Sequence, residues 1–132
     1  MTLSVREGEK GEWVVLHVSG EMDLVTSPLL RQRVHDAVAD GRRSLVLDLS
    51  EVFFCDSSGV GVLIATRRLI RSCQGRLRLI LPAPVPDGAT SAAPGGGAHV
   101  NKVLAALGVR RLFDVHPDVA SAVDDEAGPL SA

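Results

Sequence analysis

Aromatic residues are scarce in this sequence. Its 132 residues include one Trp, three Phe and no Tyr, although 45% of all residues are hydrophobic. The core must therefore be built from Val, Leu, Ile and Ala. The length fits a single domain with a sizeable core, and a charged fraction of 23% is ordinary for a globular protein.

Signals for nucleic-acid, membrane and export functions are also missing. The net charge of −2 excludes the basic field that drives nucleic-acid binding. No run approaches the ~20 apolar residues that a membrane helix needs, and the first residues lack the apolar region of a secretory signal. We therefore expect a cytoplasmic protein with no direct nucleic-acid partner and no membrane partner.

Cysteine is nearly absent as well. Cys55 and Cys73 have neither the spacing of a metal site nor that of a disulfide framework. We interpret both as reduced thiols, and we expect no bound metal and no cofactor.

Hydrophobic periodicity predicts alternating strands and helices. Strands are expected over residues 3–7, 13–19, 44–49, 76–81 and 111–115, and helices over residues 28–40, 57–72, 100–107 and 117–123. Ser27 is the predicted N-cap of the first helix, with Pro28 in its first position. This order predicts an α/β fold: a small, mixed, mostly parallel sheet with an antiparallel leading edge and helices mainly on one face.

Two segments do not fit this pattern. Residues 82–98 are rich in Pro, Gly and Ala. Such a segment can neither form the hydrogen-bond ladder of a β-strand nor bury the apolar face of a helix, so we expect a flexible loop. Residues 124–132 read as an acidic, disordered tail. The predicted organisation is one domain over residues 1–123, followed by that tail.

The joint between the strand 44–49 and the following helix is the most informative stretch. Asp56 is the predicted N-cap, which places Ser57 and Ser58 in the first helical turn with their hydroxyls outward. Gly59 lets the start of the helix lie close to its neighbours. Many helices begin in this way and do nothing else. A phosphate on such a serine, however, would meet unpaired N–H groups and the positive end of the helix dipole.

Four stretches in the right order resemble the STAS domain of bacterial anti-sigma factor antagonists. They are residues 20–23 (Gly-Glu-Met-Asp), 45–49 (Leu-Val-Leu-Asp-Leu), 54–61 (Phe-Cys-Asp-Ser-Ser-Gly-Val-Gly) and 111–115 (Arg-Leu-Phe-Asp-Val). The resemblance covers nearly the whole chain. It implies a STAS fold and a regulatory switch in place of an enzyme.

In that family, an unphosphorylated antagonist binds an anti-sigma factor that is also a serine kinase, and so releases the sigma factor. The resemblance makes Ser57 the phosphorylated residue and Ser58 the second choice. A metal-dependent serine phosphatase would reverse the reaction.

The resemblance also implies which residues meet the partner. They are Met22, Asp23, Leu24, Asp56, Ser57, Ser58 and Gly59. We expect the protein to act as a monomer.

Other functions fit this sequence less well than the switch. A hydrolase triad around Ser57 lacks the Gly-x-Ser-x-Gly elbow, and none of the four histidines has a reason to meet Ser57. A nucleotide-binding module lacks a Gly-rich loop with Lys. The main alternative is a STAS interaction module that does not switch and belongs to a larger signalling assembly.

Overall fold

The computed structural model describes residues 2–81 and 98–123. Its elements are β1 (Leu3–Lys10), β2 (Trp13–Met22), α1 (Ser27–Ala39), β3 (Ser44–Cys55), α2 (Ser57–Ser72), β4 (Arg76–Ile80), α3 (Ala98–Ala106), the 3-10 helix η1 (Arg110–Leu112), β5 (Asp114–His116) and α4 (Val119–Ala122). Apart from η1, this is the predicted order. The predicted loop 82–98 and tail 124–132 lie outside the described residues, except that Ala98 begins α3.

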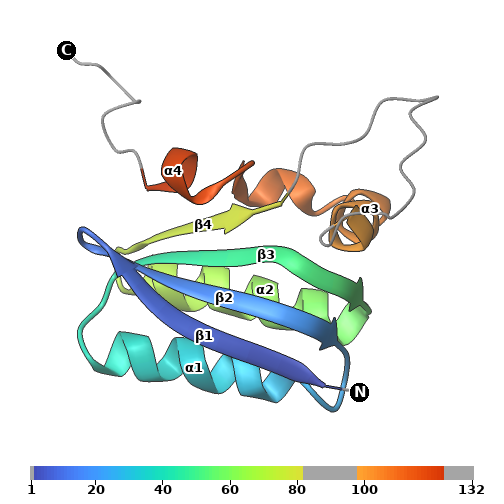
Figure 1. Ribbon diagram of the computed structural model, residues 1–132, viewed down its shortest axis with the longest axis horizontal. Coiled ribbons are helices and arrows are strands. Elements are labelled where there is room, and N and C mark those ends of the chain that lie inside the picture. Colours follow the sequence, from blue (N-terminus) through green and yellow to red (C-terminus); the bar gives the residue numbers. More distant parts are fainter. Residues whose placement is uncertain (1, 82–97, 124–132) are drawn as a thin grey trace.

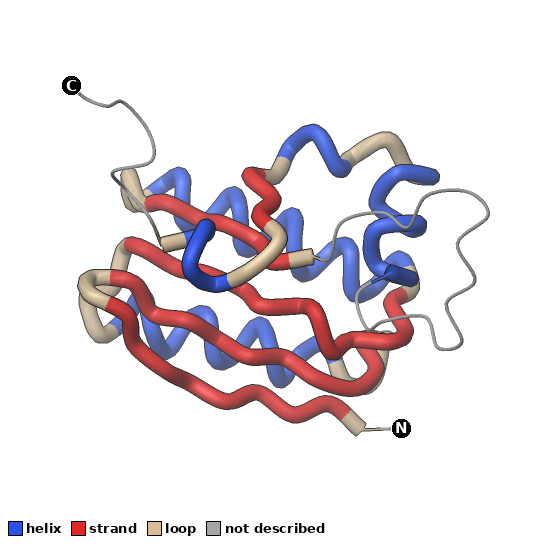
Figure 2. The backbone as a smooth tube through the Cα atoms, turned by 45° about the horizontal axis from the view of Figure 1, so that its top comes forward, coloured by secondary structure: helices blue, strands red, loops and turns tan. Residues whose placement is uncertain are grey.

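The strands form one five-stranded sheet in the order β1-β2-β3-β4-β5 (Figures 1 and 2). β1 runs antiparallel to β2, and the remaining neighbours are parallel. Parallel neighbours need a crossover connection, which is why helices separate them along the chain. The predicted mixed, mostly parallel α/β sheet with an antiparallel edge is confirmed.

Alternation along the strands divides the core between two faces of the sheet. On β2, Val14 and Leu16 are buried together with Leu30 of α1 and Leu63 of α2. Trp13 and Val15 point the other way and pack with Ala122 of α4. Figure 1 shows α1 and α2 side by side under one face and α4 over the other. Helices therefore lie mainly on one face, as predicted, and the second face is only partly covered.

β2 and β3 both extend beyond their predicted ends. β2 continues to Met22 and β3 to Cys55, and these two residues are paired in the parallel ladder. The register shifts between Gly20 and Glu21, as at a β-bulge, and pairing then resumes. The prediction ended both strands too early because the polar and Gly residues here break the alternation, whereas cross-strand pairing preserves the extended backbone.

The predicted N-cap of α1 was wrong by one residue. Thr26 occupies the N-cap position, and Ser27 is the first helical residue, with its side chain buried and its hydroxyl oxygen without a hydrogen-bond partner among the described residues. Thr26 is held there because its hydroxyl donates a 2.6 Å hydrogen bond to the carbonyl oxygen of Glu21. A contact across five residues thus decides where α1 begins.

The last predicted strand was also placed too early. Residues Arg110–Leu112 form η1, and β5 begins only at Asp114, which pairs with Arg78 of β4. The Arg67 side chain donates a 2.8 Å hydrogen bond to the carbonyl oxygen of Leu112 and ties η1 to α2. Leu107, the last residue of the predicted helix 100–107, lies just past the end of α3 and is 52% exposed.

Candidate functional site

The candidate site lies where β2 and β3 end and α2 begins. Asp56 has an extended backbone, as an N-cap does, and its carboxylate oxygen accepts hydrogen bonds from the N–H groups of Ser58 at 2.9 Å and Gly59 at 3.1 Å. The N–H of Asp56 itself donates to the carbonyl oxygen of Met22 at 3.1 Å. The predicted cap is confirmed, and it fixes the tip of α2 to the end of β2.

The two serines differ in how far they reach into solvent. Ser57 is exposed and Ser58 is half-buried. Within the described part of the chain, neither hydroxyl has a hydrogen-bond partner. Because Asp56 already occupies the N–H groups of Ser58 and Gly59, the tip offers fewer unpaired donors to an anion than the sequence led us to expect.

Gly59 allows the close packing beneath this tip. A Cβ atom at this position would lie 2.8 Å from the Cys55 sulfur and 3.0 Å from both the Cβ and the carbonyl oxygen of Met22. Met22 is fully buried. The resemblance implied that Met22 and Gly59 meet the partner, but both are buried below the surface, where they support the tip.

Asp23 organises the loop between β2 and α1, next to this tip. Its carboxylate oxygen accepts hydrogen bonds of 2.9 Å from the N–H groups of Val25 and Thr26. The backbone hydrogen bond from Thr26 is the largest cause that lowers the pKa of Asp23 below its usual range. The carboxylate therefore remains charged and holds the loop in one conformation.

The Asp23 loop carries the most exposed large apolar side chains among the described residues. Leu24 is 74% exposed and Val25 82% exposed. Phe53 on β3 is 62% exposed, and Leu29 in the first turn of α1 is 40% exposed. The resemblance supplied Leu24 only. Val25 could have been predicted from the sequence. Two adjacent apolar residues, Leu24 and Val25, lie between a predicted strand and a predicted helix, where neither side chain belongs to a buried stripe.

Helix α3 braces the strand that leads into the tip. The His99 ring stacks on Phe54 with ring centres 5.3 Å apart, and its Nε2 atom lies 3.1 Å from the carbonyl oxygen of Cys55. Burial raises the pKa of the Cys55 thiol to about 12, and the charge of Asp56 acts in the same direction. This thiol is therefore protonated at neutral pH and unsuited to nucleophilic chemistry.

Comparison with known families identifies the fold that presents this site. The family model described as "Mlab, STAS domain" matches residues 5–114. The chain belongs to the STAS domain family.

Among curated proteins, this STAS domain is 36% identical over 69 residues to the anti-sigma-F factor antagonist RsfB of Mycobacterium tuberculosis, an alignment that covers 52% of this chain and 57% of RsfB. The chain thus matches less than two thirds of the length of that relative. An anti-sigma factor antagonist from Mycobacterium paratuberculosis is 26% identical, with a TM-score of 0.74 and 92% of each chain covered.

SpoIIAA, an anti-sigma factor antagonist, shares the fold of this STAS domain. Its unphosphorylated form is 20% identical, with a TM-score of 0.65 and coverage of 96% of this chain and 100% of SpoIIAA. Its phosphorylated form, from Bacillus, is 23% identical, with a TM-score of 0.60 and coverage of 92% and 97%.

Three of the four histidines contact groups other than Ser57. His17 pairs with Asp48, His116 contacts Ser121, and His99 contacts the backbone of Cys55. Over residues 2–81 and 98–123, no group of three His, Cys, Asp or Glu side chains is arranged to hold a metal ion. The same residues contain no helix with the length and apolar character needed to cross a membrane.

Proposed function

We propose that this STAS domain is an anti-sigma factor antagonist that acts as a monomer by partner switching. Its unphosphorylated form binds an anti-sigma factor that is also a serine kinase, and so releases the sigma factor. Phosphorylation of Ser57 ends that binding, and a metal-dependent serine phosphatase restores it. The domain is a regulator and performs no catalysis of its own.

The exposed hydroxyl of Ser57 is the main support for this proposal. It stands at the first position of α2, directly after the cap residue Asp56, and it makes no hydrogen bond to the described residues. A kinase could therefore reach this hydroxyl without breaking a hydrogen bond to any of the described residues. Ser58 is less suited because it is half-buried.

A phosphate on Ser57 would add charge where negative charge is already concentrated. Phosphorylation brings about −1.5 to −2 charges, and the tip already carries the Asp56 carboxylate, with Asp23 in the neighbouring loop. The cap also takes two of the N–H groups that would otherwise bind a phosphate. The added charge would therefore remain largely unneutralised.

This charge weakens a docked interface more than it weakens the fold. Ser57 is exposed, so its phosphate stays hydrated in the free protein. A partner that packs on the apolar side chains of Leu24 and Val25 must remove that water, and burying an unpaired charge is costly. A penalty of about 3 kcal/mol lowers affinity more than a hundredfold.

Phosphorylation and binding assays with purified anti-sigma kinases from the same organism test the proposal. We expect one kinase to phosphorylate the wild-type chain on Ser57, as located by mass spectrometry, and to leave Ser57→Ala unmodified. Ser57→Asp should bind that kinase more than a hundredfold more weakly than wild type, with unchanged thermal unfolding. Ser58→Ala serves as the matched control and should still be phosphorylated.

Equal binding of wild type and Ser57→Asp would contradict the switch. The chain would then be a constitutive interaction module within a larger signalling assembly. To locate the interface, Leu24→Ala and Val25→Ala should each weaken kinase binding. Leu107→Ala removes a side chain that is 52% exposed but lies after α3, and it should leave binding unchanged.

A further inference from the structure

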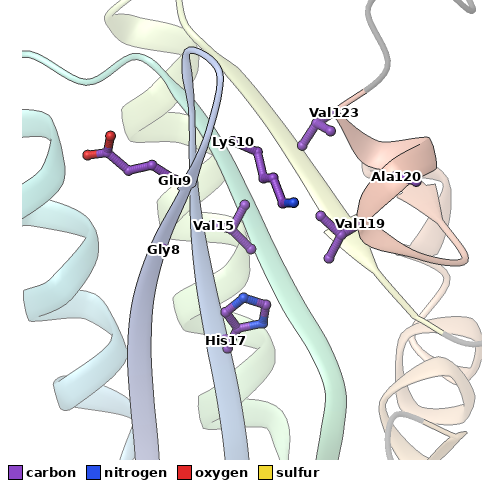
Figure 3. Close-up of a pocket in the computed structure, with 8 residues that line it drawn as sticks. All are labelled: Gly8, Glu9, Lys10, Val15, His17, Val119, Ala120 and Val123. Carbon is purple, nitrogen blue, oxygen red and sulfur yellow. The ribbon is translucent and has the colours of Figure 1, made fainter.

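A groove of about 310 Å³ lies on the partly covered face of the sheet, between the β1–β2 hairpin and α4 (Figure 3). Val15 forms its floor, and Val119 and Val123 form the wall on the side of α4. Gly8 pairs with Val15 across the hairpin, and a Cβ atom added to Gly8 would meet no atom of the described residues closer than 3.9 Å. The groove is hollow because Gly8 has no side chain.

The side of β1 that faces the groove carries positive charge, whereas Glu7 and Glu9 lie on the other side. Lys10 lines the groove, and Arg6 lies on the same face of β1, opposite His17 in the register. Within residues 2–81 and 98–123, neither Lys10 nor Arg6 has a carboxylate partner. Glu9 does not compensate them, since it pairs with Arg42 at 2.8 Å and its carboxylate points away from the Lys10 amine in Figure 3.

His17, which lines this groove, uses only one of its two ring nitrogen atoms in contacts with the described residues. His17 Nδ1 lies 2.9 Å from the Asp48 carboxylate, which leaves Nε2 without a partner among the described residues. Nε2 is the atom nearest to the Cβ position of Gly8. The groove thus combines apolar walls with basic and hydrogen-bonding groups, a combination that suits a segment with carboxylates and an aliphatic side chain.

We propose that this groove binds the acidic segment of the same chain, residues 124–132. The segment begins with Asp124, Asp125 and Glu126, directly after Val123, which lines the groove. Three residues span at most about 11 Å, so these carboxylates start beside the groove that Lys10 borders. Leu130 follows and supplies an aliphatic side chain.

Covalent attachment favours this segment over any separate acidic ligand. A short tether gives an effective concentration on the order of millimolar, so even weak ion pairs with Lys10 and Arg6 would be populated. The hairpin lies at the end of the sheet opposite to Ser57, since β2 runs from Trp13 at the hairpin to Met22 at the tip. The inference is therefore independent of the proposed switch.

A spin label on the segment tests the proposal in the full chain. The label is attached to Ser131→Cys in a Cys73→Ser background, and broadening of the amide signals of Val15 and Val119 is measured by NMR. We expect strong broadening at low salt. Lys10→Glu should reduce it about threefold, the size expected for the loss of an exposed ion pair, and higher salt should also reduce it.

Three further variants separate binding in the groove from general charge effects. Gly8→Val places a branched side chain in the groove, at a position where a Cβ atom fits, and should abolish the broadening. Arg31→Glu makes the same charge change as Lys10→Glu on α1, on the opposite face of the sheet, and should leave the broadening unchanged. Replacing residues 124–126 by lysines should restore the broadening in the Lys10→Glu variant.

Unchanged broadening in Lys10→Glu and Gly8→Val would overturn the proposal. A second result would also refute it: the spin label causes no broadening at Val15 and Val119, but the signals of these residues shift when decanoate is added. The occupant would then be a separate amphiphilic carboxylate, and not residues 124–132.

Discussion

The two glycines in the first turns of α2 should respond in opposite directions to the same substitution. Gly59→Ala adds a Cβ atom 2.8 Å from the Cys55 sulfur and 3.0 Å from the Met22 carbonyl oxygen. Overpacking of this kind costs about 1–3 kcal/mol. Replacing Gly by Ala within a helix gains about 1 kcal/mol. Because the backbone of Met22 is fixed by its hydrogen bond to Asp56, the overpacking cost should lie in the upper part of its range, which leaves a net loss of about 1–2 kcal/mol in the free energy of unfolding.

Gly61→Ala is the matched control, two residues further along the same helix. Apart from its own helix backbone, a Cβ atom at Gly61 would meet none of the described residues within 4 Å, so we expect only the helix propensity to change. We expect a gain of about 0.5–1 kcal/mol. Gly59→Ala should also reduce binding of the kinase, since the tip must shift to make room, whereas Gly61→Ala should not.

Urea denaturation followed by circular dichroism measures both variants. The midpoint should fall for Gly59→Ala and rise for Gly61→Ala, with similar m-values that allow the two free energies to be compared. If Gly59→Ala proves as stable as Gly61→Ala, the close packing of α2 on β2 and β3 is not what stabilises the tip.

Three other predictions concern individual groups at the same site. Asp56→Ala removes the cap of α2 and should lower stability by about 1 kcal/mol; Asp56→Asn, which keeps an oxygen acceptor, should lose less in the same urea assay. The lowered pKa of Asp23 means that its stabilising effect is complete above the ordinary value of 3.8 and is lost as pH falls through the folded-state value. Asp23→Asn should therefore unfold with a weaker pH dependence below pH 4, and an unchanged acid titration would contradict this. The Cys55 thiol, buried and with its pKa raised to about 12, should resist iodoacetamide at pH 8 while the less buried Cys73 reacts. Mass spectrometry should then find one alkyl group per folded chain, and two would show that Cys55 is accessible.

Local chemistry in the sequence determined the start of α2 and the order of the elements. Asp56 is followed by small residues and an apolar stripe. It specifies a capped helix through hydrogen bonds to residues only two or three positions further along the chain. Runs of Val and Leu specify the central strands β2 and β3, where consecutive residues are buried on both faces of the sheet. Both predictions were confirmed, since neither depends on distant parts of the chain.

Contacts that reach beyond the residues of one helix or strand decided what the sequence alone did not. The Thr26 hydroxyl fixes the start of α1 through the Glu21 carbonyl oxygen, and pairing with Met22 extends β3 to Cys55. Neither partner is marked by a local pattern.

The same is true of burial at the site. A Met after a β-bulge could face a partner or the core, and only the approach of Gly59 shows that Met22 is buried. The sequence therefore identified the exposed serine and its cap. The tertiary structure decided which neighbours share its surface, because exposure depends on how elements pack and not on the order of residues within any one of them.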